Sequence, residues 1–374
     1  MDCLPTNWKK LKLSKVLKVK HGKNQKQVEC DDGKYPILGS GGLMGYANDY
    51  IWDKPSVLIG RKGTINKPQF MNKPFWTVDT LFYTDIFEGY EPKWLYYVFQ
   101  TINWYKYNEA SGVPSLSAST IEKIKIIVPP FEEQKEIANI LSTWDVAIDL
   151  REKELKMEKS LLIQAINTLT KNNDFIDVKY NPISIDECTS FVNGYSFQSK
   201  SYEDVGDYNI VTIGNVQDGK LDLHSKTKKI SRLPNNISKH QILSKEDILI
   251  SMTGNVGRVC KVNESNLLLN QRVGKFIIKP VIHRDYFYYS LRSTRFLSKM
   301  IAKAQGGAQP NLSTKDIKNY YIEIPEYKRQ AIIGRYLSSL DKKIELLIDE
   351  ITQMKIQKKG LMQQLLTGKI RVQS

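Results

Sequence analysis

The 374-residue sequence contains few residues of the kinds that hold metal ions or disulfide frameworks. It has four histidines, which are scattered, and four cysteines (Cys3, Cys30, Cys188 and Cys260) without CxxC spacing. We therefore expect no zinc site, and reduced thiols in a cytoplasm fit this spacing better than a disulfide framework. The sequence also lacks an apolar signal core and any apolar run of transmembrane length, so we expect a cytoplasmic protein without membrane contact.

Motifs of several enzyme classes are missing as well. No GxxxxGK[ST] phosphate loop is present, and the glycine-rich residues 39–45 lack both the GxGxxG spacing and a helix pattern after it. Val128-Pro129-Pro130-Phe131 resembles the tetrapeptide with which amino-methyltransferases hold a target base, but those enzymes begin it with Asn or Asp. Valine cannot accept the hydrogen bond from the base, so the prolines indicate a stop before a helix. The sequence favours binding over catalysis.

An internal duplication is the strongest positive feature. Residues 110–169 are echoed by residues 306–365 at a constant offset without a gap, and Gln134 corresponds to Gln330 (330 − 134 = 196). This period is far too long for a solenoid repeat. The sequence therefore predicts two domain-sized units, each ending in a long helix.

The charge balance points to a polyanionic partner. Lys and Arg number 55 against 40 Asp and Glu, which leaves a net charge of +15. The basic residues are spread through apolar, Tyr-rich sequence and do not form a tail, so the charge belongs to a folded surface. RNA is not excluded by charge alone, because the aromatic residues could stack on bases.

Each half of the chain begins with short β-like segments and glycine-rich turns, followed by a helix. The first half reads as β-like from residue 8 to about residue 130, with a helix at residues 94–107. The second half repeats this order, with a helix at residues 286–300, and Gly63 and Gly254 stand at matching places.

The duplicated segments predict two coiled-coil-like helices. Apolar residues recur every 3.5 residues between charged flanks, although Arg151, Glu158 and Lys358 interrupt the pattern. The predicted seams are Leu141, Trp144, Ile148, Leu155, Leu162 and Leu169, and Leu337, Leu340, Ile344, Leu347, Ile351, Met354, Leu361 and Leu365. Helices of this length extend roughly 50 Å. We expect them to pack on each other and hold two domains apart; the alternative is two ordinary core helices in separate domains.

Candidate DNA contacts lie in polar, glycine-rich turns at parallel positions of the two units. Arg and Lys suit guanine edges and phosphates, whereas Asn and Gln suit adenine edges. The candidates in the first unit are Ser40, Gly41, Arg61, Lys62, Thr64, Asn66, Lys67 and Ser115. Those in the second are Asn215, Ser251, Thr253, Asn255, Arg258, Gln271, Arg272, Gln305, Gln309 and Asn311. The alternative interpretation is that these turns are ordinary solvated loops.

The order of variable domain, Leu-Ser helix, variable domain and Leu-Ser helix resembles the DNA-specificity subunit of type I restriction-modification enzymes. The resemblance spans the whole chain. It is carried by residues 129–138 with Leu141-Ser142, Ile324-Pro325 with residues 330–332 and 337–341, residues 247–250, residues 270–273, and the ending 365–371. The departures are mild: Tyr327-Lys328-Arg329 replaces an acidic pair before Gln330, and charges break the seams.

This resemblance implies an α/β (α+β) fold with a pseudo-twofold internal repeat. Two tandem target-recognition domains with twisted sheets would be separated by two long antiparallel coiled-coil-like helices. The expected boundaries are a recognition domain at 1–130, a central spacer helix at 131–172, a second recognition domain at 173–324 and a C-terminal spacer helix at 325–374.

The resemblance also implies a function. Each domain would read one half of a bipartite site in double-stranded DNA, and two modification subunits would methylate adenine while restriction subunits cleave DNA. S-adenosylmethionine, ATP and Mg would be bound by those partners, and this chain would hold no cofactor and no catalytic group. The alternatives are an architectural coiled-coil protein that binds DNA without sequence specificity, and a self-contained methyltransferase or nuclease, which the missing motifs disfavour.

Overall fold

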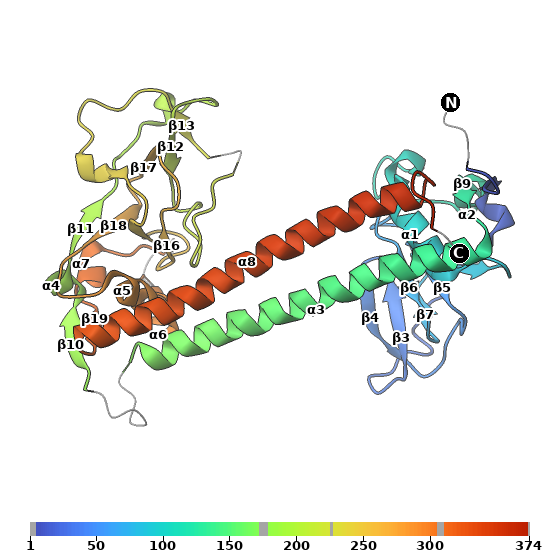
Figure 1. Ribbon diagram of the computed structural model, residues 1–374, viewed down its shortest axis with the longest axis horizontal. Helices are drawn as coiled ribbons and strands as arrows, with labels where there is room; N and C mark the ends of the chain where they lie inside the picture. Colours follow the sequence, from blue (N-terminus) through green and yellow to red (C-terminus); the bar gives the residue numbers. More distant parts are fainter. Residues whose placement is uncertain (1–4, 172–178, 225–226, 305–309, 373–374) are drawn as a thin grey trace. The chain divides into compact units, whose positions relative to one another are not determined.

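The computed structural model describes residues 5–171, 179–224, 227–304 and 310–372 (Figure 1). The chain forms two compact units. The first comprises Met1–Glu152 and Asp349–Ser374, and the second comprises Lys153–Ile348. The last part of the sequence therefore belongs to the same unit as the first part.

The first unit contains two small sheets and one strand pair. The larger sheet is antiparallel and has the order β2 (Leu17–His21), β8 (Leu81–Ile86), β5 (Ser56–Gly60) and β6 (Gln69–Met71). The smaller has the order β4 (Gly42–Ala47), β3 (Tyr35–Gly39) and β7 (Trp76–Thr77), with β3 and β7 parallel. The pair is β1 (Lys9–Lys12) with β9 (Lys125–Val128), and the short helices are α1 (Pro92–Thr101) and α2 (Ala118–Lys123).

The second unit repeats this plan. One antiparallel sheet has the order β11 (Thr189–Asn193), β18 (Val273–Ile278), β15 (Ile248–Ser251) and β16 (Val259–Lys261). The other has the order β13 (Lys229–Ile230), β12 (Tyr208–Val211), β17 (Leu267–Leu269) and β14 (Ile242–Leu243), with β12 and β17 parallel. β10 (Asn181–Ser184) pairs with β19 (Tyr321–Ile324), and the short helices are α4 (Ile185–Cys188), α5 (Arg284–Leu291), α6 (Thr294–Ala304) and α7 (Thr314–Lys318). The predicted mixed α/β class and the internal repeat are confirmed.

The predicted helix at residues 286–300 is two helices, because Ser293 starts a new one. Its Oγ accepts a hydrogen bond from the backbone N–H of Phe296 at 3.2 Å, which is the geometry of a helix N-cap. The predicted helix at 94–107 is likewise interrupted: α1 ends at Thr101, and a 3₁₀ turn, Trp104–Tyr107, follows.

Two long helices, α3 (Phe131–Leu169) and α8 (Tyr327–Leu365), each have 39 residues. A buried glutamine ties each to its own unit. The side-chain oxygen of Gln134 accepts from the Glu91 N–H at 2.9 Å, and its nitrogen donates to the Pro129 carbonyl at 3.0 Å. Gln330 makes the same two bonds, at 2.9 Å each, with His283 and Pro325. The copied glutamine therefore fixes where each long helix begins.

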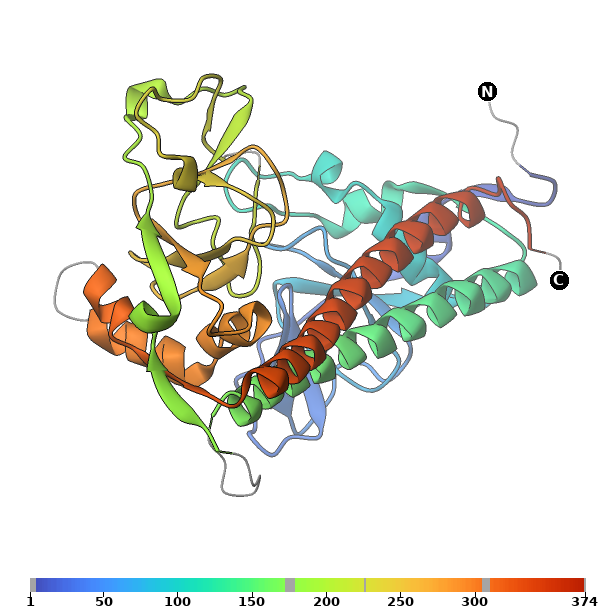
Figure 2. The same cartoon turned by 60° about the vertical axis from the view of Figure 1, so that its left-hand side comes forward.

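Within each unit, parts of α3 and α8 lie side by side in opposite directions (Figure 2). The structure shows why three charged residues interrupt the predicted apolar seams: each forms an ion pair with a residue of the other long helix. The pairs are Lys358–Asp145 (2.5 Å) and Arg151–Glu350 (3.1 Å) in the first unit, and Glu158–Lys343 (2.6 Å) in the second. A polar group in an apolar seam sets the register of two helices, and three charged pairs do so here.

The predicted seam residues are all buried or half-buried. Leu141 and Leu365 join the core of the first unit, together with the buried aromatic residue Trp94 of α1. Leu162, Leu337 and Ile344 belong to one core cluster of the second unit, together with residues of α5 and α6. Within each unit, the long helices therefore contact each other and also contribute side chains to the core.

Candidate nucleic-acid interface

The loop that follows β5 is held by two neighbouring segments of the first unit. The N–H of Arg61 donates to the Thr80 carbonyl at 2.8 Å, and the N–H of Gly63 donates to the Pro114 carbonyl at 2.9 Å. Lys62 forms an isolated antiparallel bridge with Ser115. The loop, the turn after β7 and the segment before α2 therefore form one continuous surface.

The loop after β15 has the same frame in the second unit. The N–H of Met252 donates to the Arg272 carbonyl at 3.0 Å, and the N–H of Gly254 donates to the Pro310 carbonyl at 3.1 Å. Thr253 forms the bridge with Asn311 that corresponds to the Lys62–Ser115 bridge. The two units thus share one backbone frame but carry different side chains on it.

Glycine is required at the centre of both loops. Gly63 has φ +85° and Gly254 has φ +71°, values in the left-handed region that residues with a Cβ rarely adopt. A Cβ at Gly63 would in addition lie 3.3 Å from Oγ of Ser40, so the turn between β3 and β4 approaches this loop closely.

The remaining candidates of the first unit are distributed over the same loop. Arg61 is half-buried and its Nη1 donates to the Asp79 carbonyl at 3.3 Å, whereas Lys62 is exposed. Ser40, Thr64 and Ser115 are half-buried, and Gly41, Asn66 and Lys67 are exposed. The loop therefore presents a cationic surface made mainly of Lys62, Lys67 and part of Arg61.

The second unit brings three candidates into one cluster. The side-chain oxygen of Asn311 accepts from Oγ1 of Thr253 at 2.9 Å and lies 3.4 Å from Nη1 of Arg272. Gln271 is exposed beside them and accepts from Oγ of Ser196 at 3.1 Å. This cluster is polar and carries one guanidinium, in contrast with the more basic loop of the first unit.

Two candidates have a structural role that the sequence did not reveal. Asn215 is 2% exposed, and its amide accepts from Thr212 N–H at 2.9 Å and donates to the Asp222 carbonyl at 2.9 Å. Ser251 is fully buried, and its Oγ accepts from Arg258 N–H at 3.1 Å. The expected DNA contact of these two side chains is corrected accordingly: they shape loops from within. Gln305 and Gln309 lie outside the described residues.

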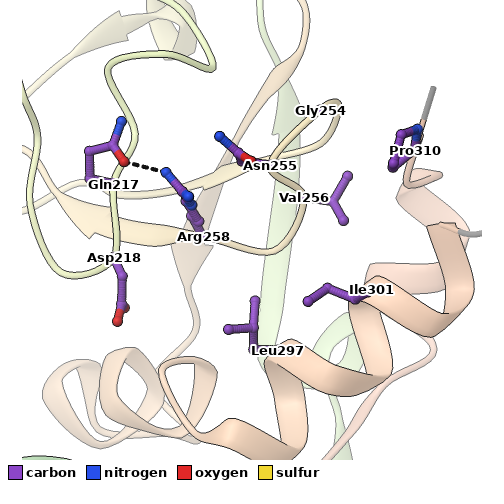
Figure 3. Close-up of a pocket in the computed structure, with 9 residues that line it drawn as sticks. All are labelled: Gln217, Asp218, Gly254, Asn255, Val256, Arg258, Leu297, Ile301 and Pro310. Carbon is purple, nitrogen blue, oxygen red and sulfur yellow. Dashed lines mark hydrogen bonds between the residues drawn. The ribbon is translucent and has the colours of Figure 1, made fainter. Parts of the chain in front are cut away.

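A hollow of about 610 Å³ lies beside the loop that follows β15 (Figure 3). Gln217, Asn255 and Arg258 lie on one side of it, and Leu297 and Ile301 of α6 lie on the other. Nη1 of Arg258 donates to Oε1 of Gln217. Gln217 was not among the candidates, although it follows Asn215 by only two residues. Its side-chain contact crosses 41 residues, which no local pattern reveals.

Asp218, which also lines this hollow, is paired with a buried arginine. Arg292 lies 2.5 Å from a carboxylate oxygen of Asp341 and 3.5 Å from one of Asp218. Burial opposes its charge, but the Tyr288 hydroxyl and these two carboxylates outweigh burial and raise the pKa of Arg292. Arg292 is therefore a permanent internal charge, and Asp218 is directed to it.

The described part of the chain holds neither a candidate metal site nor a membrane-spanning helix. Its residues contain no group of three or more His, Cys, Asp or Glu side chains placed to hold a metal ion. Among its helices, none is both long and apolar enough to cross a membrane.

The fold defines a protein of two units with a shared plan, and each unit presents a polar loop on the same backbone frame. The family model for the type I restriction modification DNA specificity domain matches residues 5–158 and 177–355. The chain therefore belongs to this family of type I restriction-modification specificity subunits.

Individual relatives agree with this assignment. The type I restriction enzyme MjaVIII specificity subunit of Methanocaldococcus jannaschii is 26% identical, over 99% of this chain and 95% of the relative. The crystal structure of the type I restriction-modification S subunit from M. genitalium has a TM-score of 0.65 at 16% identity and covers 96% of both chains. A structure concerning complex assembly and conformational transition of the type I R-M system has a TM-score of 0.59 at 12% identity, covering 98% of this chain and 100% of the other.

Proposed function

We propose that this specificity subunit reads a split DNA site, with one half assigned to each unit. The observation that carries this proposal is the shared loop frame with divergent side chains. At equivalent backbone positions the first unit has Lys62 and Ser115, and the second has Thr253 and Asn311. A common frame presents both loops to DNA in the same manner, and different side chains then select different bases.

The chemistry of the two loops suits this division. The first loop offers Lys62, Lys67 and part of Arg61, which favour phosphates and guanine edges. The second offers the Thr253, Arg272 and Asn311 cluster, whose amide and guanidinium favour adenine and guanine edges. The two half-sites should therefore differ in sequence, and the complete site should not be a palindrome.

We further propose that the chain works without a catalytic group of its own, in the cytoplasm. Two modification subunits would bind S-adenosylmethionine and methylate adenine, and restriction subunits would use ATP and Mg to cleave DNA. The family membership and the likeness to a structure concerning assembly of a type I system support these partners. Because the two units share one plan, each offers an equivalent surface to a copy of the same modification subunit.

The competing function is an architectural protein that binds DNA without sequence preference. The net charge of +15 alone would suit both functions. The divergence of side chains on a shared loop frame favours the specificity subunit, because contacts to phosphates carry no sequence information, whereas the second loop offers the polar, uncharged Thr253 and Asn311 at these positions.

Methylation by reconstituted complexes tests the proposal. The modification subunits should methylate a split motif only when this chain is present, and the chain alone should transfer no label from S-adenosylmethionine to plasmid DNA. Methylation by the purified chain alone, or methylation without any preferred sequence by the complex, would contradict the proposal.

A further inference from the structure

Both polar atoms of the Gln217 carboxamide form hydrogen bonds. Its nitrogen Nε2 donates to the Gly214 carbonyl at 2.7 Å, and its oxygen Oε1 accepts from Nη1 of Arg258. Its backbone N–H also donates to the Lys220 carbonyl at 2.9 Å. The carboxamide is therefore a rigid acceptor and is oriented toward one cation, as Figure 3 shows.

Arg258 is likewise held at two points. Its backbone N–H donates to Oγ of the buried Ser251 at 3.1 Å, and the tip of its side chain is bound by Gln217. The carboxylate that could compete for it, Asp218, lies 3.5 Å from Nε of Arg292 and so has a cation of its own. A guanidinium has five N–H donors, so a single bond to Gln217 leaves donors for a ligand at the hollow.

The corresponding cation of the first unit lacks such a support. β5 pairs Leu58 with Gln69, and β15 pairs Leu249 with Cys260, so both members of the pair are shifted by 191 residues. The same shift places Lys67 at the position of Arg258. The loop that carries Gln217, between β12 and β13, corresponds in the first unit to the short turn at Ser40-Gly41, which has no carboxamide.

We propose that Gln217 is a specificity-determining residue, which positions Arg258 to read the edge of one guanine in the half-site of the second unit. An arginine recognises guanine through two parallel bonds to O6 and N7, so rotation of the guanidinium destroys the recognition. A neutral carboxamide fixes this orientation and leaves the positive charge intact, whereas a carboxylate would cancel it. This inference rests on the proposed DNA-reading function.

The test uses the full-length chain assembled with its modification subunits and a library of sites randomised in both half-sites. Gln217→Met removes the acceptor at nearly constant volume. It should lower the preference at one base pair of the second half-site about 10-fold, and Arg258→Ala should lower the preference at the same base pair. The double variant should lose no more than Arg258→Ala alone, because Gln217 acts through Arg258.

Two further variants separate positioning from folding. Gln217→Glu keeps an acceptor for Arg258 but loses the donor to the Gly214 carbonyl and adds a negative charge, so it should restore only part of the preference and weaken binding to all sequences. Lys67→Ala should change only the first half-site or the affinity for all DNA. An unchanged preference in Gln217→Met, a change at a base pair that Arg258→Ala does not affect, or an equal loss of affinity for all sequences would overturn the inference. A wild-type complex without a split preference would instead refute the proposed function itself.

Discussion

Lys358 interrupts the apolar seam of α8, and the structure indicates that Asp145 stabilises it there. The Lys358 ammonium lies 2.5 Å from one oxygen of Asp145, and its side chain is only 11% exposed. The other oxygen of Asp145 accepts from the hydroxyl of the buried Tyr97 at 2.6 Å. Burial and this hydrogen bond raise the pKa of Tyr97 above its ordinary value, so the phenol remains a donor. Asp145→Leu would leave both donors without this acceptor.

The expected loss of stability follows from these contacts. Removing one partner of a fully buried ion pair costs about 3–5 kcal/mol, and an exposed pair is worth about 0–1 kcal/mol. The Asp145 side chain is 40% exposed, so we expect a loss of about 2–3 kcal/mol for Asp145→Leu. The double variant Asp145→Leu/Lys358→Met should recover all but about 1 kcal/mol, because an apolar pair replaces a charged one in the seam.

Tryptophan fluorescence during urea unfolding provides a selective assay. All six tryptophans lie between residues 8 and 144, within the first unit, so their emission reports the unfolding of that unit. Asp341→Leu is the matched control, because Asp341 accepts from Tyr289 and Arg292 in the second unit. It should leave the tryptophan transition in place. Equal destabilisation by the single and double Asp145 variants would refute the argument, because the cost would then not come from an unpaired lysine.

Three other outcomes follow from the structure. A fragment ending near residue 172 lacks Leu365 of the first core, and should dimerise in sedimentation experiments at micromolar concentration; a folded monomer would contradict the role given to the helices. Arg61→Ala should cost about 1–3 kcal/mol on the specific site only, whereas Lys62→Ala should weaken binding to all DNA and lower the salt slope by about one; wild-type affinities in both would exclude this loop as a contact. Burial raises the pKa of the Cys260 thiol to about 12. Alkylation at pH 8 should therefore modify the partly exposed Cys30 and spare Cys260 until denaturant is added. Rapid modification of Cys260 in the native protein would contradict its burial.

The duplication and the helical periodicity were sufficient to predict the two units and the two long helices, whereas the α/β class was implied by the family resemblance. Both features are encoded locally: Gln134 and Gln330 recur at a fixed offset, and the apolar stripe is visible in either copy alone. The prediction of glycine loops at equivalent places also rested on local sequence, since Gly63 and Gly254 both occupy left-handed positions.

The side-chain partners within the loops could not be predicted, because they join residues far apart in the sequence. In sequence, Asn215 looks like an exposed recognition residue, because it lies in a polar, glycine-containing turn. In the structure, its amide forms hydrogen bonds with the Thr212 N–H and the Asp222 carbonyl. Gln217 reaches Arg258 across 41 residues. The seam interruption at Lys358 is intelligible only beside Asp145, which is 213 residues away.

The claim that each unit reads its own half of the site is tested most directly by exchanging one recognition domain. Residues 1–130 would be replaced by the corresponding segment of a relative with a different target, and the methylated motif of the complex would be determined by sequencing the methylated bases. The account predicts that one half of the motif changes and the other half remains as in the parent complex. A change in both halves, or in neither, would contradict it.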